Sequence, residues 1–125
     1  MTESTIAPVH RFVDALEARD FDALQAAFAP HVVLRALVPT GLREAKGAAA
    51  ARGLIESWFV DSERYTIVAR AHGSVGDREH ATYRVEGHEV GADYVAEQEL
   101  FATVTAHGIT HLDLLCSGFR PKIER

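Results

Sequence analysis

The N-terminal half of the chain places apolar residues at the three-to-four-residue spacing of amphipathic helices. We expect a first helix capped by Ser4 or Thr5, a second capped by Asp20 and ended by Pro30, and a third over Gly47–Phe59. Between the second and third helices, residues 31–38 are nearly all apolar, which predicts a well-covered strand. The segment from Pro39 to Gly41 then has the composition of a turn.

The period of the pattern changes to two near Tyr65, which indicates strands. Glycine-containing reversals separate the four expected strands, which are Tyr65–Gly73, Glu79–Val90, Tyr94–Ala106 and Ile109–Phe119. Helices gathered at one end and antiparallel strands at the other predict an α+β fold with a single curved sheet. We expect one domain over residues 1–125, which is long enough to bury its own core.

Composition and charge narrow the classes of function. The chain is 47% apolar and 25% charged, as in ordinary globular proteins, and its formal net charge is −5. It has no basic run, so we expect no nucleic-acid partner, and its apolar runs are too short to span a bilayer. The polar start Met1–Thr5 does not resemble a secretory signal, and one cysteine excludes an intrachain disulfide. We therefore expect a soluble, cytoplasmic protein.

Several segments together resemble one known superfamily. Residues 11–24 resemble its opening helix pair, Phe28–Val33 the join into its first strand, Gly87–Gly91 the Gly-Thr-His-Thr-Gly segment of its SnoaL branch, and Gly108-Ile109 its closing turn. The chain thus resembles the nuclear-transport-factor-2-like superfamily, in its SnoaL-like and ketosteroid-isomerase-like branch. The resemblance implies a cone-shaped curved antiparallel sheet, three N-terminal helices packed on its concave face, and a small-molecule pocket at the open end. It implies no particular reaction.

The catalytic sets of the resembled enzymes are mostly absent. The aspartate base of ketosteroid isomerases falls on Ala36 or Leu37, and their tyrosine falls on Phe12. Their carboxylic acid alone has a counterpart, which is Glu99. Classical ketosteroid isomerisation is therefore not expected.

The acidic and histidine positions of SnoaL-type cyclases are also changed. The aspartate falls near Cys116 or Ser117, neither of which is a carboxylate acid, and the histidine falls on Glu89. If an acid–base reaction occurs, it needs another arrangement of groups. We take Glu99 as the first candidate catalytic residue and Glu89 as the second.

The sequence allows two orientations for Glu99. Strand alternation groups it with Phe101, while the opposite face carries the more apolar set Tyr94, Ala96, Gln98, Leu100, Ala102 and Val104. The greater apolarity of the opposite face predicts that Glu99 faces solvent, whereas the resemblance places it in the pocket. Inside a pocket, desolvation would raise its pKa and suit acid–base work; outside, it is a solvated glutamate.

Other side chains are candidates for contact with a ligand. They are Tyr83, Trp58, Phe101, Cys116 and Phe12, each of which could equally belong to the core. Seven histidines are scattered without the spacing of a metal-binding motif. We therefore expect no metal and no cofactor.

Two functional hypotheses remain. In the first, the chain binds a small apolar organic ligand, with or without isomerase, cyclase, dehydratase or hydrolase chemistry through a pocket carboxylate. In the second, it is a non-catalytic binding module or dimeric scaffold. The last strands are apolar on both faces, with Phe101 and Leu115 opposite Leu100 and Leu114, and this pattern predicts a homodimer.

Overall fold

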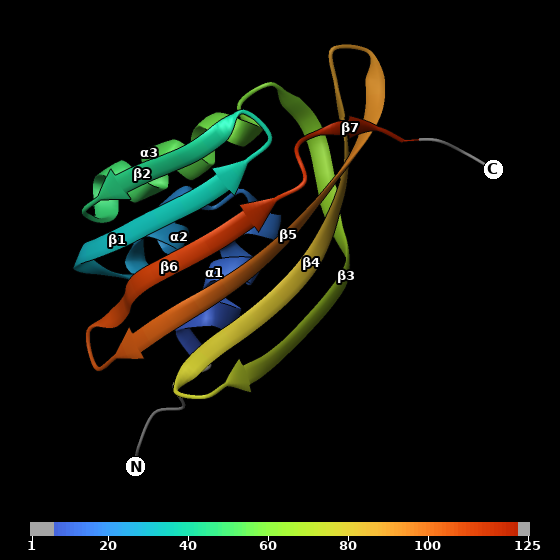
Figure 1. Cartoon of the computed structure of the whole chain (residues 1–125). Coiled ribbons are helices and arrows are strands. Elements are labelled where there is room, and N and C mark those ends of the chain that lie inside the picture. Colours follow the sequence, from blue (N-terminus) through green and yellow to red (C-terminus); the bar gives the residue numbers. More distant parts are fainter. Residues whose placement is uncertain (1–6, 123–125) are drawn as a thin grey trace.

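The computed structural model describes residues 7–122 as helices on one face of a curved sheet (Figure 1). The helices are α1 (Ala7–Ala18), α2 (Phe21–Ala26) and α3 (Ala48–Phe59). The strands are β1 (Phe28–Val38), β2 (Gly41–Lys46), β3 (Ser62–Val75), β4 (Arg78–Glu89), β5 (Ala92–Thr105), β6 (Gly108–Cys116) and β7 (Arg120–Pro121). The expected α+β class is confirmed, and the candidate caps Ser4 and Thr5 lie outside the described residues.

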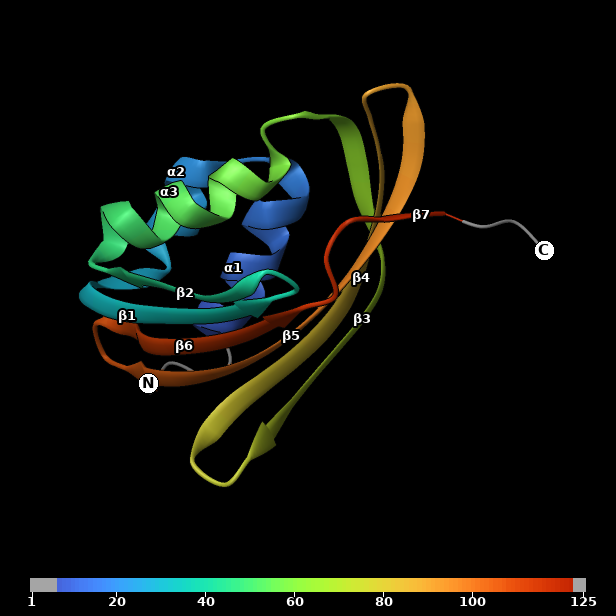
Figure 2. The same cartoon turned by 45° about the horizontal axis from the view of Figure 1, so that its top comes forward.

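The sheet is mixed, although the sequence predicted an antiparallel one. Its order is β2-β1-β6-β5-β4-β3, with the short β7 paired to β5. Every pair is antiparallel except β1 with β6, which run parallel. A parallel pair needs a long crossover, and the chain between these two strands supplies it through β2, α3 and three further strands. The sheet curves around the helices and does not close (Figure 2).

Strand β2 was missed by the sequence analysis. It follows the predicted turn and pairs with β1 at the edge of the sheet, where Ala45 lies opposite Leu34. Its residues lack a regular apolar alternation, and four of the six are exposed. An edge strand is held mainly by backbone hydrogen bonds to one neighbour, so its side chains carry little periodic signal.

The core lies between the concave face and the helices. Phe12 and Leu16 of α1 and Phe59 of α3 are fully buried there. Leu100 of β5 and Leu112 of β6 meet them from the sheet, also without exposure. Burial of one such side chain stabilises the folded state by about 1.5–3 kcal/mol. Alternate residues of each strand are therefore buried on the concave face against the helices, and the residues between them lie on the outer face.

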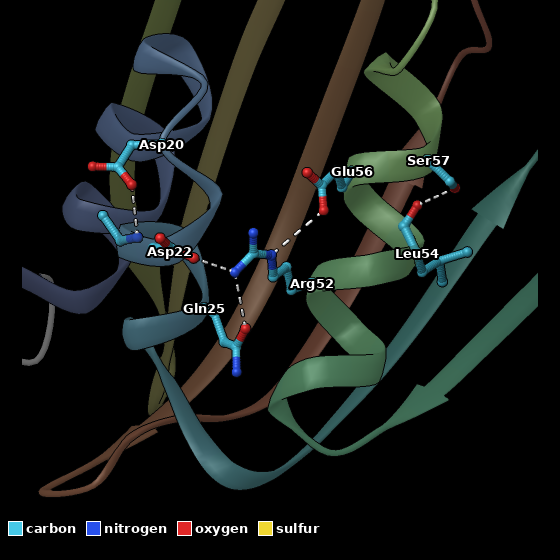
Figure 3. A network of polar contacts seen from close by, with 8 residues as sticks. Asp20, Asp22, Gln25, Arg52, Leu54, Glu56 and Ser57 are labelled. Atoms are coloured by element: carbon cyan, nitrogen blue, oxygen red, sulfur yellow. Dashed lines mark hydrogen bonds and ion pairs between the residues drawn. The ribbon is translucent and has the colours of Figure 1, made fainter.

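Polar contacts cap α2 and join it to α3 (Figure 3). Asp20 caps α2 by accepting a hydrogen bond of 3.0 Å from the backbone N–H of Ala23, as its sequence position predicted. Arg52 on α3 reaches across to α2, where it pairs with Asp22 and donates to the side chain of Gln25 at 3.3 Å. These contacts join α2 to α3 on the side away from the sheet.

Candidate functional site

Three polar side chains lie in a line across the concave face. Tyr83 on β4 is directly opposite Gln98 on β5, and Gln98 is directly opposite Cys116 on β6. The Tyr83 hydroxyl donates to Gln98 Oε1 at 2.5 Å, and Gln98 Nε2 donates to Cys116 Sγ at 3.4 Å. Tyr83 and Gln98 are each 3% exposed and Cys116 is 8% exposed. We call these three residues the polar row.

The polar row offers neutral hydrogen-bonding groups. Burial raises the pKa of Tyr83 above its usual 10, so its hydroxyl stays protonated at neutral pH. The amide nitrogen of Gln98 carries two N–H groups, and its partner among the described residues is a sulfur, which accepts weakly. A buried amide with spare donor capacity suits a neutral acceptor such as a carbonyl oxygen.

An aromatic cluster lies near the polar row, at one end of the concave face. Its members are Phe59, Tyr65, Tyr94 and Phe119. The ring of Phe119 lies 5.2 Å from that of Phe59 and 4.8 Å from that of Tyr94, measured between centroids. The Tyr94 hydroxyl lies 2.7 Å from Ser62 Oγ, and both residues are buried. These contacts bring together α3, the start of β3, β5 and the segment after β6.

Arg19, directly after α1, holds the same region together. Its guanidinium donates to the carbonyl oxygens of Ser62 at 2.6 Å and Phe59 at 3.1 Å, and it lies over the ring of Tyr65. The Tyr65 hydroxyl donates to the carbonyl of Leu16. Burial raises the pKa of Tyr65 to about 12. The aromatic cluster is therefore fixed to α1 as well as to α3.

Glu99 lies on the outer face of the sheet, away from the polar row. Its carboxylate is 2.7 Å from His80 Nε2, and its side chain is 43% exposed. The ring of His80 in turn packs at a tilt against Phe101, with 4.7 Å between centroids. The sequence resemblance had placed Glu99 on the concave side, and this orientation is corrected. The alternation of β5 decides it, because Leu100 and Gln98 occupy the helix-facing positions.

A shallow hollow of about 210 Å³ lies beside Glu99 on the outer face. Its lining includes Phe101, Leu37, Leu42 and Leu115, and the three leucines are each about half exposed. Glu99 and Phe101, two of the expected site residues, are therefore neighbours, but on the face opposite Tyr83 and Cys116. This mostly apolar hollow has the character of a contact surface.

The remaining expected site residues are dispersed. Glu89 shares the strand face of Tyr83 but lies at the far end of β4, opposite Ala92 and three alternate positions away. Phe12 is fully buried in α1, within the core. Trp58 on α3 is partly buried and packs against the core. The structure therefore brings Tyr83 and Cys116 together and leaves Glu89 and Glu99 apart from them.

Gln98 is the residue that the sequence analysis overlooked as a functional candidate. A signal was present, because Gln98 is the one amide among the apolar residues of its strand face. A polar side chain at a core-facing position needs hydrogen-bonding partners, so such a residue is a candidate for a binding role. The partners themselves came from two other strands, whose registers are not visible in the sequence.

Histidine–carboxylate contacts occur in pairs on the outer surface. His80 contacts Glu99, and His88 Nδ1 lies 2.8 Å from Asp93 Oδ1. Within residues 7–122, no three His, Cys, Asp or Glu side chains are arranged to hold a metal ion. None of the helices in that same range has the length and apolarity needed to cross a bilayer.

Comparisons with known proteins agree with the fold. A family model described as the SnoaL-like domain matches residues 9–114. A candidate polyketide cyclase from Xanthomonas campestris pv. campestris is similar in structure, with 23% identity, a TM-score of 0.73, and coverage of 89% of this chain and 88% of that one. No curated protein sequence matches the chain.

Two further solved structures have the same fold. A protein from Catenulispora acidiphila with a ketosteroid-isomerase-like fold, in complex with trimethylamine, is 17% identical with a TM-score of 0.75, over 91% of this chain and 88% of that one. An epoxide hydrolase of the LEH-like type from M. tuberculosis is 17% identical with a TM-score of 0.71, over 90% and 82%. At these identities the likeness concerns the fold alone.

Proposed function

This chain belongs to the SnoaL-like domain family, and on that premise we propose that it binds a small apolar organic ligand on the concave face of its sheet. The observation that carries the proposal is the polar row, a hydrogen-bonded tyrosine, glutamine and cysteine buried among apolar side chains. A few convergent polar groups in apolar surroundings are typical of small-molecule sites.

The chemistry of the row favours a neutral polar group on the ligand. The second amide N–H of Gln98 can donate to a carbonyl oxygen, and the Tyr83 oxygen can accept from a hydroxyl. Neither group carries a charge at neutral pH, and an ionised ligand would lose its hydration without gaining a counter-ion. The ligand is therefore an apolar molecule with a ketone, aldehyde or alcohol group.

The positions of the glutamates favour binding without a carboxylate acid–base step. Glu99 faces outward and Glu89 lies far along β4, so neither is placed to exchange a proton with a group bound at Gln98. The alternative, that Glu99 or Glu89 is a catalytic acid or base, requires the ligand to bind at the outer hollow or the hairpin end instead.

The test compares a ketone with its hydrocarbon analogue. We expect 4-phenylbutan-2-one to bind measurably by ligand-observed NMR, and butylbenzene to bind more weakly. In Gln98→Leu the ketone should lose about tenfold in affinity, the equivalent of about 1.4 kcal/mol for one hydrogen bond, while butylbenzene is unaffected.

Glu99→Gln serves as the matched control, because this residue lies on the same strand but on the outer face. It should bind the ketone as the unaltered protein does. Equal affinity for the ketone in Gln98→Leu, or loss of binding in Glu99→Gln, would contradict the proposed site. The second result would favour a ligand site at Glu99.

A second candidate function is that of a dimeric scaffold, and the outer face favours it. Leu37, Leu42 and Leu115 form a row across β1, β2 and β6, and each is about half exposed. Arg35 and Asp113 flank these leucines and carry opposite charges. A two-fold axis through such a face can cover the leucines and place opposite charges against each other, so we propose a homodimer with this interface.

A further inference from the structure

The segment after β6 leaves the sheet and then returns to it. Strand β6 pairs with β5 as far as Cys116 opposite Gln98, and β7 resumes pairing where Arg120 lies opposite Val95. Residues 117–119 bridge the gap. They carry Phe119 to the aromatic cluster, and their Gly118 contacts Cys116 at the end of the polar row. We call residues 117–121 the closing segment.

Phe119 fills an aromatic site formed by other elements. Its ring packs edge-on against Phe59 of α3 and is tilted against Tyr94 of β5. Such contacts suit any single six-membered aromatic ring, because they depend on the ring's faces and edges and not on its attachment to a backbone. A ligand ring of the same size could therefore make the contacts that Phe119 makes here.

The closing segment is also linked directly to the polar row. Gly118 N–H donates to Cys116 Sγ at 3.4 Å, the same sulfur that accepts from Gln98. Gly118 has a φ of +83°, and a Cβ there would lie 2.7 Å from Cγ of Pro39. The segment thus depends on glycine to follow this path. Its displacement would remove one donor from the sulfur beside Gln98.

Apart from the ring contacts of Phe119 and the hydrogen bond of Gly118, the closing segment is held by hydrogen bonds at its two ends. Ser117 exchanges hydrogen bonds with the backbone of Glu97, at 2.9 Å and 2.8 Å. Strand β7 is two residues long, and Lys122 beyond it reaches the carbonyl of Asp93 and the carboxylate of Glu86. All these contacts are near solvent, where hydrogen bonds exchange readily with water.

We propose that Phe119 occupies the position of the ligand's aromatic ring, and that the closing segment lifts to admit the ligand. This inference rests on the function proposed above and narrows its ligand class to aryl ketones or aryl alcohols. The ring takes the place of Phe119 between Phe59 and Tyr94, and the neutral oxygen reaches the amide of Gln98. The closing segment thereby competes with the ligand. The apparent affinity is then the affinity of the open form multiplied by the fraction of molecules that are open.

A reversible cross-link tests the movement. Val95 and Arg120 are directly opposite on antiparallel strands, at a separation that a disulfide can span. The variant V95C/R120C should bind 4-phenylbutan-2-one normally when reduced. When oxidised it should lose about tenfold or more in affinity, since the closed form becomes permanent. A matched control, T103C/H111C, joins β5 to β6 on the outer face and should bind equally in both redox states.

The ring replacement is tested by Phe119→Ala. This variant removes the competing ring, so affinity for 4-phenylbutan-2-one should rise by about tenfold, while that for hexan-2-one, which has no ring, changes little. Equal binding by oxidised and reduced V95C/R120C, or no gain in Phe119→Ala, would overturn the role of the closing segment. Failure of the reduced and unaltered proteins to bind the ketone at all would overturn the proposed function and this inference with it.

Discussion

The hydroxyl of Tyr83 on β4 donates a hydrogen bond to the side-chain oxygen of Gln98 on β5, directly across the strand pair. Because both groups are buried, removing one leaves the other without its partner in an apolar environment. The pair therefore contributes to stability as a unit, apart from any role in binding.

Gln98→Leu should lower the free energy of unfolding by about 1–3 kcal/mol, because the Tyr83 hydroxyl loses its acceptor. Tyr83→Phe should act in the same direction. The double variant should lose less free energy of unfolding than the two single variants lose together, by about 0.5–3 kcal/mol, because neither polar group is then left unpaired. Urea denaturation of the four proteins measures this coupling. Strict additivity would show that the two side chains do not act together.

The proposed homodimer depends on the outer leucines. Leu115→Lys places a charge within that surface and should convert the dimer to a monomer at micromolar concentration, as measured by sedimentation equilibrium. Val68→Lys is the matched control, because Val68 is similarly exposed, at 48%, but lies on β3 away from these leucines. A monomeric unaltered protein would rule out the dimer.

The tyrosines predict the behaviour of the protein in alkali. The chain has three tyrosines, Tyr65, Tyr83 and Tyr94, and burial raises the pKa of each above its usual 10, that of Tyr65 to about 12. Folding thus favours the neutral forms of these tyrosines. This stabilisation is complete below pH 10 and is lost as the pH rises toward the pKa values that the tyrosines have in the folded protein. Absorbance at the tyrosinate band should stay low at pH 10.5 in the folded protein. The same titration in urea should give the ordinary midpoint, and matching curves would contradict the burial of these hydroxyls.

The contact between α1 and β3 should weaken in mild acid. His72 stacks on His10 with 3.9 Å between centroids, and Arg70 donates to it while pairing with Asp14. Desolvation first, and then the charges of His10 and Arg70, lower the pKa of His72 below 6.5. Near that pH the unfolded chain consequently binds more protons than the folded one, so the free energy of unfolding falls as the pH drops below about 6.5.

His72→Gln should flatten this part of the stability curve, as measured by urea denaturation between pH 7 and pH 5. His107→Gln, at an exposed turn, supplies the control and should leave the curve unchanged. A pH profile that is the same with and without His72 would exclude the proposed cause.

The amino-acid sequence alone determined the elements that depend on local periodicity. The spacing of Phe12 and Leu16 fixed a helix face, and the alternation of Tyr94, Ala96 and Leu100 fixed a buried strand face. Both patterns are present in the fold because the hydrophobic effect buries the apolar side chains along one face of a helix or strand together. The family resemblance is likewise confirmed by the SnoaL-like match over residues 9–114.

Tertiary structure alone decided how the elements meet. The parallel pairing of β1 with β6 depends on a crossover that no local pattern encodes, and the edge strand β2 depends on its hydrogen bonds to β1. The sequence left two orientations for Glu99, and the folded sheet placed it on the outer face, as strand alternation alone had indicated. Gln98 became a candidate site residue only once two strand registers placed Tyr83 and Cys116 on either side of it. Register arises from contacts between residues far apart in the chain, and for this reason the polar row and the position of Phe119 could be seen only in the folded molecule.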